Sequence, residues 1–327
     1  MKNSLGDVNP KLARTVSSHL NRIEKRLLCE AQADTEFVSA AASHIIKAGG
    51  KRFRPTLVVL SSQLGSQARK EDVCNASVVV ELTHVASLYH DDVMDEAALR
   101  RGVPSANAKW GNLTAILVGD YLFARASAVV ADLGADYVAL QARTFQRLVQ
   151  GQIAETEGPR GNQDPLAHYL QVVADKTGSL ISTSAVFGAM VAGLPDEQIE
   201  ALRLFGEEVG AIFQLGDDII DIVSDESGKT PGADLKAGVP TLPTLLVRQL
   251  ARPQDGRLLE LLDGGINTDA HVQEALTLLR SHPALAQARS DVIRRSELAR
   301  SYLAPLPKVP ARDALEALCD TVVTRSS

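Results

Sequence analysis

Two copies of a short acidic motif, Asp-Asp-x-x-Asp, occur in the chain, at residues 91–95 and 217–221. Each follows an apolar segment with helical periodicity, so the first and last aspartates of a copy project from the same helix face. Like charges at this spacing repel each other, and a helix C-terminus already carries partial negative charge. A hard divalent cation relieves this repulsion, and Mg²⁺ commonly bridges carboxylates and substrate phosphates. Solvated acidic helix ends are the structural alternative, but the second copy favours a Mg²⁺ site.

Basic side chains gather in four short glycine-containing stretches. These are GGKRFRP at 49–55, RRG at 100–102, KTG at 176–178 and Lys229 within SGKTPG at 227–232. Any one of these cations alone is typical of a solvated surface. Together with carboxylate-bound Mg²⁺ they suit a diphosphate group, whose charge must be balanced and whose oxygens must be oriented. The Gly-Lys-Thr within the last stretch is not a P-loop, because neither the earlier glycine nor a preceding strand is present.

Two other polar residues share a helix face with the acidic motifs. His84 lies seven residues, or two helical turns, before Asp91, and Gln214 lies three residues before Asp217. A histidine in an apolar helix is either a satisfied core residue or, when aligned with carboxylates near a basic loop, a substrate ligand. The residues alone leave both roles open for His84. Gln214 could reach the same ligand as Asp217.

The segments that must position these residues have helical periodicity. Apolar residues recur with this period in five segments: 77–89, 114–130, 143–153, 166–173 and 196–223. No alternating strand pattern exceeds about four residues, and no Asn-Gly or Asp-Gly turn joins two such patterns. We therefore predict an all-α fold with one domain over residues 1–327, in which residues 1–30 are a candidate for loose order.

Composition narrows the functional classes. The 327 residues include 34 Lys+Arg against 40 Asp+Glu, a net charge of −6, and this acidic balance offers no electrostatic footprint for nucleic acid. Hydrophobic residues at 45% exclude general disorder. The three cysteines are far apart and lack metal-ligand spacing, which is typical of free thiols in a reducing compartment. No secretory signal opens the chain, and the longest uncharged stretch, 177–195, is rich in Ser, Thr and Gly. We expect a soluble cytoplasmic protein without a transmembrane segment.

The chain resembles the trans-prenyltransferases, the polyprenyl diphosphate synthases of the isoprenoid synthase fold. The resemblance rests on GGKRFRP (49–55), ELTHVASLYHDDVMDEAALRRG (81–102), KTGSLI (176–181) and QLGDDIIDIVSDESGKTPGADLKAGVPTLP (214–243). Flanking segments match more loosely, so the likeness covers nearly the whole chain. It implies a single large helical bundle around a central cavity and a homodimer. It also implies a Mg²⁺-dependent enzyme that condenses an allylic diphosphate of the geranyl or farnesyl class head-to-tail with isopentenyl diphosphate.

The resemblance also implies roles for individual residues. The Mg²⁺ ligands would be Asp91 and Asp95 from one helix and Asp217 from the other, and the supporting carboxylates would be Asp92, Asp218 and Asp221. Isopentenyl diphosphate would be held by Lys51, Arg54, His84 and Arg101. The allylic diphosphate would be bound by Arg100, Lys176, Thr177, Gln214 and Lys229, with Lys176 also counted as catalytic. Departure of the diphosphate would leave an allylic carbocation, which the isopentenyl double bond attacks before a proton is lost.

One position departs from the family pattern. The family often has a lysine directly before the Thr-Leu-Pro of the downstream loop, whereas this chain has Val239. The task of that lysine would fall to Lys229, to Lys236 or to no residue. Diphosphate binding at this loop is therefore expected to differ in detail.

Small residues before the first acidic motif predict a medium- or long-chain product. In the family, bulky aromatic residues four or five positions before the motif stop chain growth, and here Ser87 and Ala86 occupy those positions, with Thr83 a further turn away. One isoprene unit spans roughly 5 Å, about one helical turn, so each missing stop allows about one more unit. Alternatively another helix closes the tunnel, through Phe145, Leu148 or Val149. The exact length and the preferred primer are not determined by these residues.

Three other functions are alternatives to a synthase. A metal phosphohydrolase of the HD type would draw on His44, His84 and His90, but it has no use for two acidic motifs and GGKRFRP. A terpene cyclase shares the fold but usually lacks the second motif and the basic isopentenyl site. A non-catalytic or weakly active subunit of a heteromeric synthase usually loses an acidic motif. This chain keeps both motifs, but Val239 leaves the subunit alternative open.

Overall fold

The computed structural model describes residues 9–223 and 231–326, and it confirms the all-α prediction for them. By its internal contacts the chain divides into two compact units. Unit 1 comprises Met1–Gln146, Leu180–Arg203 and Pro305–Leu315, and unit 2 comprises Arg147–Ser179, Leu204–Ala304 and Glu316–Ser327. The single domain over 1–327 and its central cavity stay predictions.

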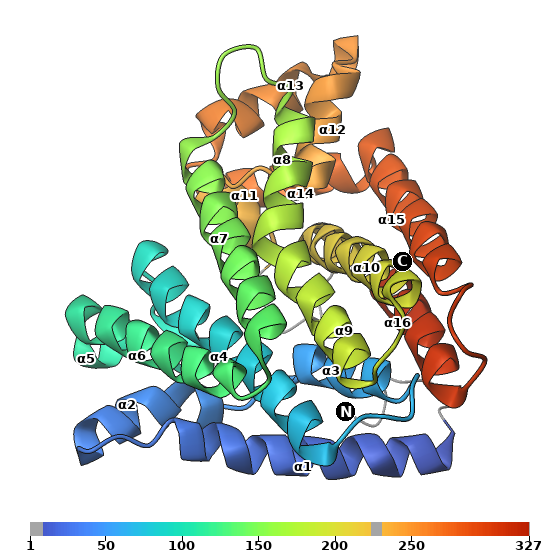
Figure 1. The fold of residues 1–327 in the computed structure, drawn as a ribbon. Helices are drawn as coiled ribbons and strands as arrows, with labels where there is room; N and C mark the ends of the chain where they lie inside the picture. Colours follow the sequence, from blue (N-terminus) through green and yellow to red (C-terminus); the bar gives the residue numbers. More distant parts are fainter. Residues whose placement is uncertain (1–8, 224–230, 327) are drawn as a thin grey trace. The chain divides into compact units, whose positions relative to one another are not determined.

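Unit 1 contains the helices that lead to the first acidic motif (Figure 1). Its complete elements are α1 (Pro10–Glu30), α2 (Glu36–Lys47), α3 (Phe53–Ser62), α4 (Lys70–Met94), β1 (Leu99–Arg100), β2 (Val103–Pro104), α5 (Ala106–Trp110) and α6 (Asn112–Ala131). Four further helices have residues in both units: α7 (Ala135–Glu157), α9 (Ser179–Val191), α10 (Asp196–Val223) and α16 (Pro310–Ser326).

Unit 2 contains the second acidic motif, near the end of α10. Its complete helices are α8 (Pro165–Val173), α11 (Ala233–Ala237), α12 (Leu242–Leu250), α13 (Gly256–Glu260), α14 (Asp269–Arg280) and α15 (Pro283–Tyr302). Three short irregular turns join them: a π-helical turn η1 (Ala174–Gly178), a 3₁₀ turn η2 (Pro253–Asp255) and a second π turn η3 (Leu261–Gly265).

The α1 helix shows that residues 10–30 are regular rather than loosely ordered. The Asn9 side chain accepts a hydrogen bond from the backbone N–H of Lys11 at 2.9 Å, and Pro10 occupies the first turn, where its missing donor costs nothing. The helix then buries an apolar stripe against α3 and α4, made of Leu12, Val16, Leu20, Ile23 and Leu27.

The α4 helix is the central element of unit 1. It contacts α1, α3, α5 and α6, and most of its residues between Val73 and Tyr89 are buried. A helix that is apolar all round can only be stable when it is covered on all sides. The acidic motif at its C-terminal end therefore emerges from a rigid support.

A short β-hairpin, with two residues in each strand, follows the first acidic motif. It was not predicted from the sequence. Leu99 pairs with Pro104 and Arg100 with Val103. The connecting residues, Arg101 and Gly102, have φ of 54° and 79°. Positive φ at both central residues is the requirement of a type I′ hairpin turn. An arginine in the first of these positions hid the turn from a search for Asn-Gly or Asp-Gly.

Among the described residues, α6 is long and apolar enough by composition to cross a membrane. Only 39% of its most apolar window is buried within the chain. A core helix of a soluble protein meets the same criterion, and α6 packs along α4 in the most extensive helix contact of unit 1. The absence of a transmembrane segment stays a prediction.

Close packing of α9 on α3 generates a test of the unit 1 core. A Cβ on Gly188 would lie 2.3 Å from the Val58 carbonyl oxygen and 2.6 Å from the Ser61 Cβ. Gly188→Ala should therefore lower the free energy of unfolding by about 1–3 kcal/mol, because the two helices must separate. Urea denaturation measures the change, and Gly256→Ala is the control, because a Cβ there meets nothing within 4 Å. Equal stabilities for the two variants would contradict the close packing.

Candidate active site

The first acidic motif does not present three equivalent carboxylates. Asp91 lies half-buried in the last turn of α4, and Asp95 is the exposed C-cap residue, whose N–H donates to the Asp91 carbonyl at 2.8 Å. Asp92 is instead completely buried. The pair that the helical spacing predicted, Asp91 and Asp95, is therefore the pair on the accessible side.

Asp92 ties the hairpin to α4. Its Oδ1 accepts a hydrogen bond from the Nε of Arg100 at 2.6 Å and forms an ion pair with the Nη2 of Arg100 at 2.5 Å. Burial raises the pKa of the Asp92 carboxyl, although the Arg100 guanidinium opposes the shift. Arg100 was expected beside the allylic diphosphate, and in this structure its charge is engaged by Asp92. Asp92 thus forms an ion pair that holds β1, and its expected role in supporting a metal cluster stays a prediction.

Arg52 is an anchor of the basic loop that sequence reasoning did not assign. Its Nε donates to Glu24 at 2.5 Å and its Nη1 to the buried Glu81 at 2.8 Å, while Nη2 donates to the Ile46 carbonyl at 2.9 Å. Burial alone would lower the pKa of Arg52, but the two carboxylates outweigh it and raise the pKa. The backbone of Arg52 has φ of 49°, the left-handed region. Its position within the basic stretch GGKRFRP indicated that Arg52 belongs to the loop. Its carboxylate partners, Glu24 and Glu81, lie far away in the sequence, so no local pattern pointed to these contacts.

Arg101 packs against the glycines of the same loop. Its Nη1 donates to the carbonyls of Ile45, at 3.1 Å, and Gly49. A Cβ on Gly50 would lie 3.0 Å from the Arg101 Cζ and 3.1 Å from the Arg52 Nη1. Burial lowers the pKa of Arg101, and the neighbouring charges of Arg52 and Arg100 lower it further. Gly50 therefore leaves room for the two guanidinium groups to approach the loop.

Arg54 and His84 complete the basic cluster of unit 1. Both side chains are half-buried, and burial lowers the pKa of Arg54 to about 10, with Arg101 adding to the shift. The pKa of His84 lies well below its usual value because of burial and the positive charges of Arg54 and Arg101. His84 is therefore neutral at neutral pH. The Arg54 Nε is buried without a hydrogen bond among the described residues, and Lys51 of the same loop is exposed.

The middle aspartate of the second motif is buried, as it is in the first motif. Asp218 is buried and accepts hydrogen bonds from the Tyr169 hydroxyl, from the Leu242 N–H at 2.9 Å and from the Gln214 amide at 3.2 Å. Burial raises the pKa of Asp218 to about 6, against the effect of these three donors. Tyr169, which the sequence did not single out, joins α8 to α10 here. Asp217, the expected ligand, lies half-buried on the same helix.

The last aspartate of the second motif organises the following loop. Asp221 accepts hydrogen bonds from the N–H groups of Ala233 and Asp234 at 3.2 and 3.3 Å, at the start of α11. Lys229, expected at the allylic diphosphate, lies outside the described residues. Lys236 donates to Asp269 at 2.8 Å, and Val239 is 43% exposed. Asp221 is therefore engaged with the loop that follows the motif.

Lys176 and Thr177 lie in the π-helical turn η1 between α8 and α9. The ammonium of Lys176 pairs with Glu155 of α7, and the Thr177 hydroxyl lies 3.5 Å from the Gln214 Oε1. Unit 2 thus brings three residues expected at the allylic diphosphate to neighbouring positions on η1 and α10. A π turn inside a helix is uncommon and is often found at functional sites.

The three residues expected to govern product length are buried along α4. Ala86, Thr83 and Ser87 are 0%, 1% and 8% exposed. The hydroxyls of Thr83 and Ser87 donate to carbonyls of their own helix, at 2.8 and 2.9 Å. They therefore present small, largely apolar surfaces. Phe145, the alternative stop, stacks on Phe123 of α6 with ring centroids 4.3 Å apart.

Comparison with known proteins gives consistent results. A family model described as polyprenyl synthetase matches residues 35–279. A nonaprenyl diphosphate synthase of Mycobacterium tuberculosis is 49% identical over 323 residues, 98% of this chain and 96% of that protein. Component 2 of the heptaprenyl diphosphate synthase of Geobacillus stearothermophilus is 40% identical over 233 residues, covering 70% of this chain and 72% of the relative.

A solved structure supports the same grouping. The crystal structure of geranylgeranyl pyrophosphate synthase from Corynebacterium glutamicum, complexed with calcium and isoprenyl diphosphate, has a TM-score of 0.88 and 42% identity, and the match covers 97% of this chain and 98% of that one. The family match spans more than half of the chain and includes both acidic motifs, the basic loop and η1. This chain belongs to the polyprenyl synthetase family.

Proposed function

We propose that this protein is a trans-polyprenyl diphosphate synthase, which condenses an allylic diphosphate of the geranyl or farnesyl class with isopentenyl diphosphate to a medium- or long-chain product. Family membership supports the reaction class. The observation that carries the proposal is the basic cluster of unit 1, where Arg54, His84 and Arg101 surround a glycine loop near the end of α4. Two partly buried arginines beside a neutral histidine that can donate a hydrogen bond are suited to an anionic ligand.

The cluster has the properties of an isopentenyl diphosphate site. The buried Arg54 Nε lacks an acceptor among the described residues, and a diphosphate oxygen would satisfy it. A neutral His84 can donate one hydrogen bond to the same group. Lys51 is exposed on the same loop and would add a third positive charge to those of Arg54 and Arg101. These residues would orient the diphosphate and leave the apolar end of isopentenyl diphosphate to react.

The carboxylates fit Mg²⁺ bound together with substrate. Asp91 and Asp95 lie one turn apart at the end of α4, and Asp217 is the corresponding residue of α10. No group of three or more His, Cys, Asp or Glu capable of holding a metal occurs in the described parts of the chain. The carboxylates at the end of α4, Asp91 and Asp95, are a donor set suited to Mg²⁺, which takes its other ligands from phosphates and water. When bound, Mg²⁺ would neutralise the diphosphate and ease its departure. The calcium in the Corynebacterium structure supports a divalent cation.

The residues of unit 2 would act on the leaving group. Lys176, Thr177 and Gln214 would hold the allylic diphosphate and stabilise the charge that grows on it. Its carbon–oxygen bond breaks with both electrons on the diphosphate, and the isopentenyl double bond supplies the pair for the new carbon–carbon bond. The proton that the product loses passes to the released diphosphate. No nucleophilic side chain is needed.

A catalytic chain is favoured over a non-catalytic subunit of a heteromeric synthase. The Geobacillus component 2 shows that relatives with a heteromeric name exist. Both acidic motifs are nevertheless present here, and the Asp92 and Asp218 contacts that support them are formed. The assay separates the two functions, because a component would be inactive alone.

We propose that the chain works as a homodimer in the cytoplasm. In the described chain, α6 exposes large apolar side chains, with Leu113 72%, Leu117 58% and Ile116 41% exposed. Such a continuous apolar face is typical of a protein interface. A second copy of this chain, with the same face, is the occupant that the family resemblance implies.

Incubation of the purified chain with radiolabelled isopentenyl diphosphate, farnesyl or geranyl diphosphate and Mg²⁺ tests the function. Elongated prenyl diphosphates are expected, and chromatography of the dephosphorylated products gives their length. Release of phosphate without elongation would indicate a hydrolase. No reaction at all would indicate a subunit that needs a partner.

Asp91→Ala should lower kcat by roughly three orders of magnitude or more, because it removes charge stabilisation used in the transition state. The unfolding midpoint should change little, since Asp91 is only half-buried. Steady-state kinetics and thermal unfolding measure both effects. Asp132→Ala, at the exposed end of α6, is the control. Near-normal turnover in Asp91→Ala would refute the metal role of this residue.

Ala86→Phe should shorten the product, because a phenyl ring on α4 would block the growing chain about one turn from the acidic motif. Chromatography of the products from wild-type and variant enzyme provides the measurement. A loss of stability of about 1–3 kcal/mol from overpacking is expected as well. If a folded variant makes the wild-type product, chain length is controlled elsewhere, with Phe145 the next candidate.

Leu117→Glu should convert the dimer to monomer, because it places a charge on the apolar face of α6. Sedimentation equilibrium of wild-type and variant protein measures the change. Ser127→Glu, on the same helix but with a polar side chain, is the control. A monomeric wild-type protein would refute the homodimer.

A further inference from the structure

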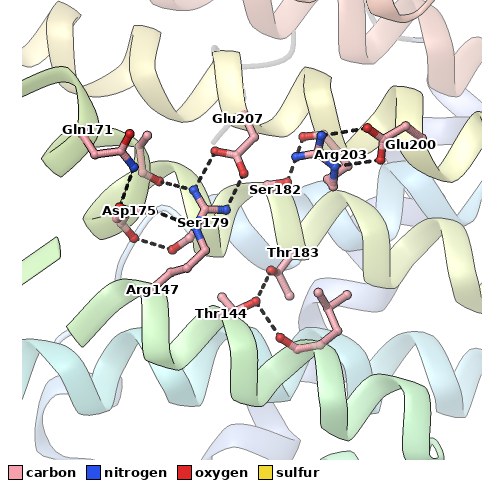
Figure 2. A network of polar contacts seen from close by, with 12 residues as sticks. Thr144, Arg147, Gln171, Asp175, Ser179, Ser182, Thr183, Glu200, Arg203 and Glu207 are labelled. Atoms are coloured by element: carbon pink, nitrogen blue, oxygen red, sulfur yellow. Dashed lines mark hydrogen bonds and ion pairs between the residues drawn. The ribbon is translucent and has the colours of Figure 1, made fainter. Parts of the chain in front are cut away.

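The π turn η1 is held from three directions by one arginine of α7. The Nε of Arg147 donates to the Asp175 Oδ1 at 2.8 Å, and its Nη1 donates to the Glu207 Oε1 at 2.6 Å. Its Nη2 lies 3.3 Å from both the Glu207 Oε2 and the Ala174 carbonyl oxygen. Figure 2 shows the guanidinium between the Glu207 carboxylate of α10 and Asp175 of η1. A single planar group thus joins α7, η1 and α10.

The ion pairs of Arg147 with Asp175 and Glu207 are partly buried and fully charged. Asp175 accepts a second hydrogen bond, from Gln171 at 2.7 Å, so both of its oxygens are used. Arg147 remains fully charged, because the two carboxylates outweigh burial and raise its pKa. All three charged side chains are partly shielded from water, with Asp175 and Glu207 each 19% exposed. Such ion pairs are stronger and more specific in geometry than exposed ones.

Glycines press the π turn between α7 and α10. A Cβ on Gly151 would lie 2.7 Å from the backbone nitrogen of Lys176, and one on Gly210 would lie 2.5 Å from the Cα of Gly178. A Cβ on Gly178 would lie 3.2 Å from the Glu207 Oε2, one of the atoms that face Arg147. The backbone of η1 is therefore in direct contact with both helices. The π conformation of η1 therefore depends on the contacts that hold α7 and α10 against it.

We propose that Arg147 is a positioning residue for the allylic diphosphate, which holds η1 in its π conformation so that Lys176 and Thr177 keep their binding directions. This inference rests on the proposed function of those two residues. A π turn contains one residue more than an α turn, so relaxation to α-helix rotates the following side chains by about 100°. The wider turn is less favourable by itself and persists where its surroundings hold it. Arg147, which touches no substrate atom in this scheme, supplies that hold through Asp175 and Glu207.

The shape of the guanidinium is essential to this role. Arginine presents its donors in a fixed plane, and here they reach two carboxylates and one carbonyl at once. Lysine has the same charge but offers a single nitrogen. Arg147→Lys should therefore behave like Arg147→Met, whereas a purely electrostatic role would be rescued by lysine.

The test compares the two substrates. Arg147→Met and Arg147→Lys should each raise the KM for farnesyl diphosphate by about tenfold or more and lower kcat, since misplacing a binding group by about 1 Å can cost a hundredfold. The KM for isopentenyl diphosphate should change less than about twofold, because its expected ligands Arg54 and His84 belong to unit 1. Equilibrium binding of farnesyl diphosphate with Mg²⁺, without isopentenyl diphosphate, should weaken by the same factor as the KM rises.

The matched control is Arg203→Met. Arg203 of α10 also forms a two-pronged ion pair, with Glu200 at 2.7 Å for both contacts, but this pair is exposed and lies within one helix (Figure 2). It should leave both KM values unchanged. The double variant Arg147→Met/Glu207→Gln should lose no more than Arg147→Met alone, because the two residues act through one contact.

The outcomes separate this inference from the proposed function. If wild-type protein neither elongates nor binds farnesyl diphosphate, the proposed function fails. If wild-type protein is active but the Arg147 variants raise both KM values equally, or lower only the unfolding midpoint, Arg147 is merely structural and the inference is overturned. Should both Arg147 variants fail to fold, Asp175→Asn removes one prong and must still raise the KM for farnesyl diphosphate selectively. An unchanged KM in that variant would also overturn the inference.

Discussion

Holding several cations close together inside a protein is the constraint on which unit 1 depends. Arg52, Arg54 and Arg101 lie in one region of unit 1, where the charge of Arg101 lowers the pKa of Arg54 and the charge of Arg52 lowers that of Arg101. Burial makes their mutual repulsion stronger, because the interior screens charge less than water does. The buried carboxylate Glu81, together with Glu24, offsets part of it. The positive charge that these two carboxylates do not balance is the basis on which we propose a diphosphate site here.

The same principle explains why the two acidic motifs divide their labour. In each motif the middle aspartate is buried and forms structural contacts. Asp92 pairs with Arg100, and Asp218 accepts hydrogen bonds from Tyr169 and from the first N–H of α12. Burying a carboxylate is costly unless donors surround it. The outer aspartates are less buried, and the proposed function uses Asp91, Asp95 and Asp217 among them as metal ligands, while Asp221 accepts hydrogen bonds from the loop that follows it.

In unit 2 the important contacts are made by residues that never touch substrate in the proposed reaction. Arg147, Asp175 and Glu207 join three helical segments around η1, and the glycines at 151 and 210 let the backbones meet. Precise placement of Lys176 and Thr177 is what differential binding of the leaving group requires. Binding residues are therefore only part of this site, and the rest consists of the groups that hold their helices in place.

The sequence by itself determined the all-α class and the family, and it proposed the residues that would bind metal and diphosphate, because helical periodicity and the spacing of Asp91 and Asp95 are local properties. It also identified the KTG segment and the basic loop. Only the tertiary structure decided the partners of the middle aspartates, the anchors Arg52 and Tyr169, the hairpin at Arg101 and Gly102, and the π turn. The physical reason is distance along the chain: Arg52 meets Glu81, and Arg147 meets Glu207, only after the helices between them have packed. A buried charge finds its counter-charge by folding, and no local pattern records which one it will be.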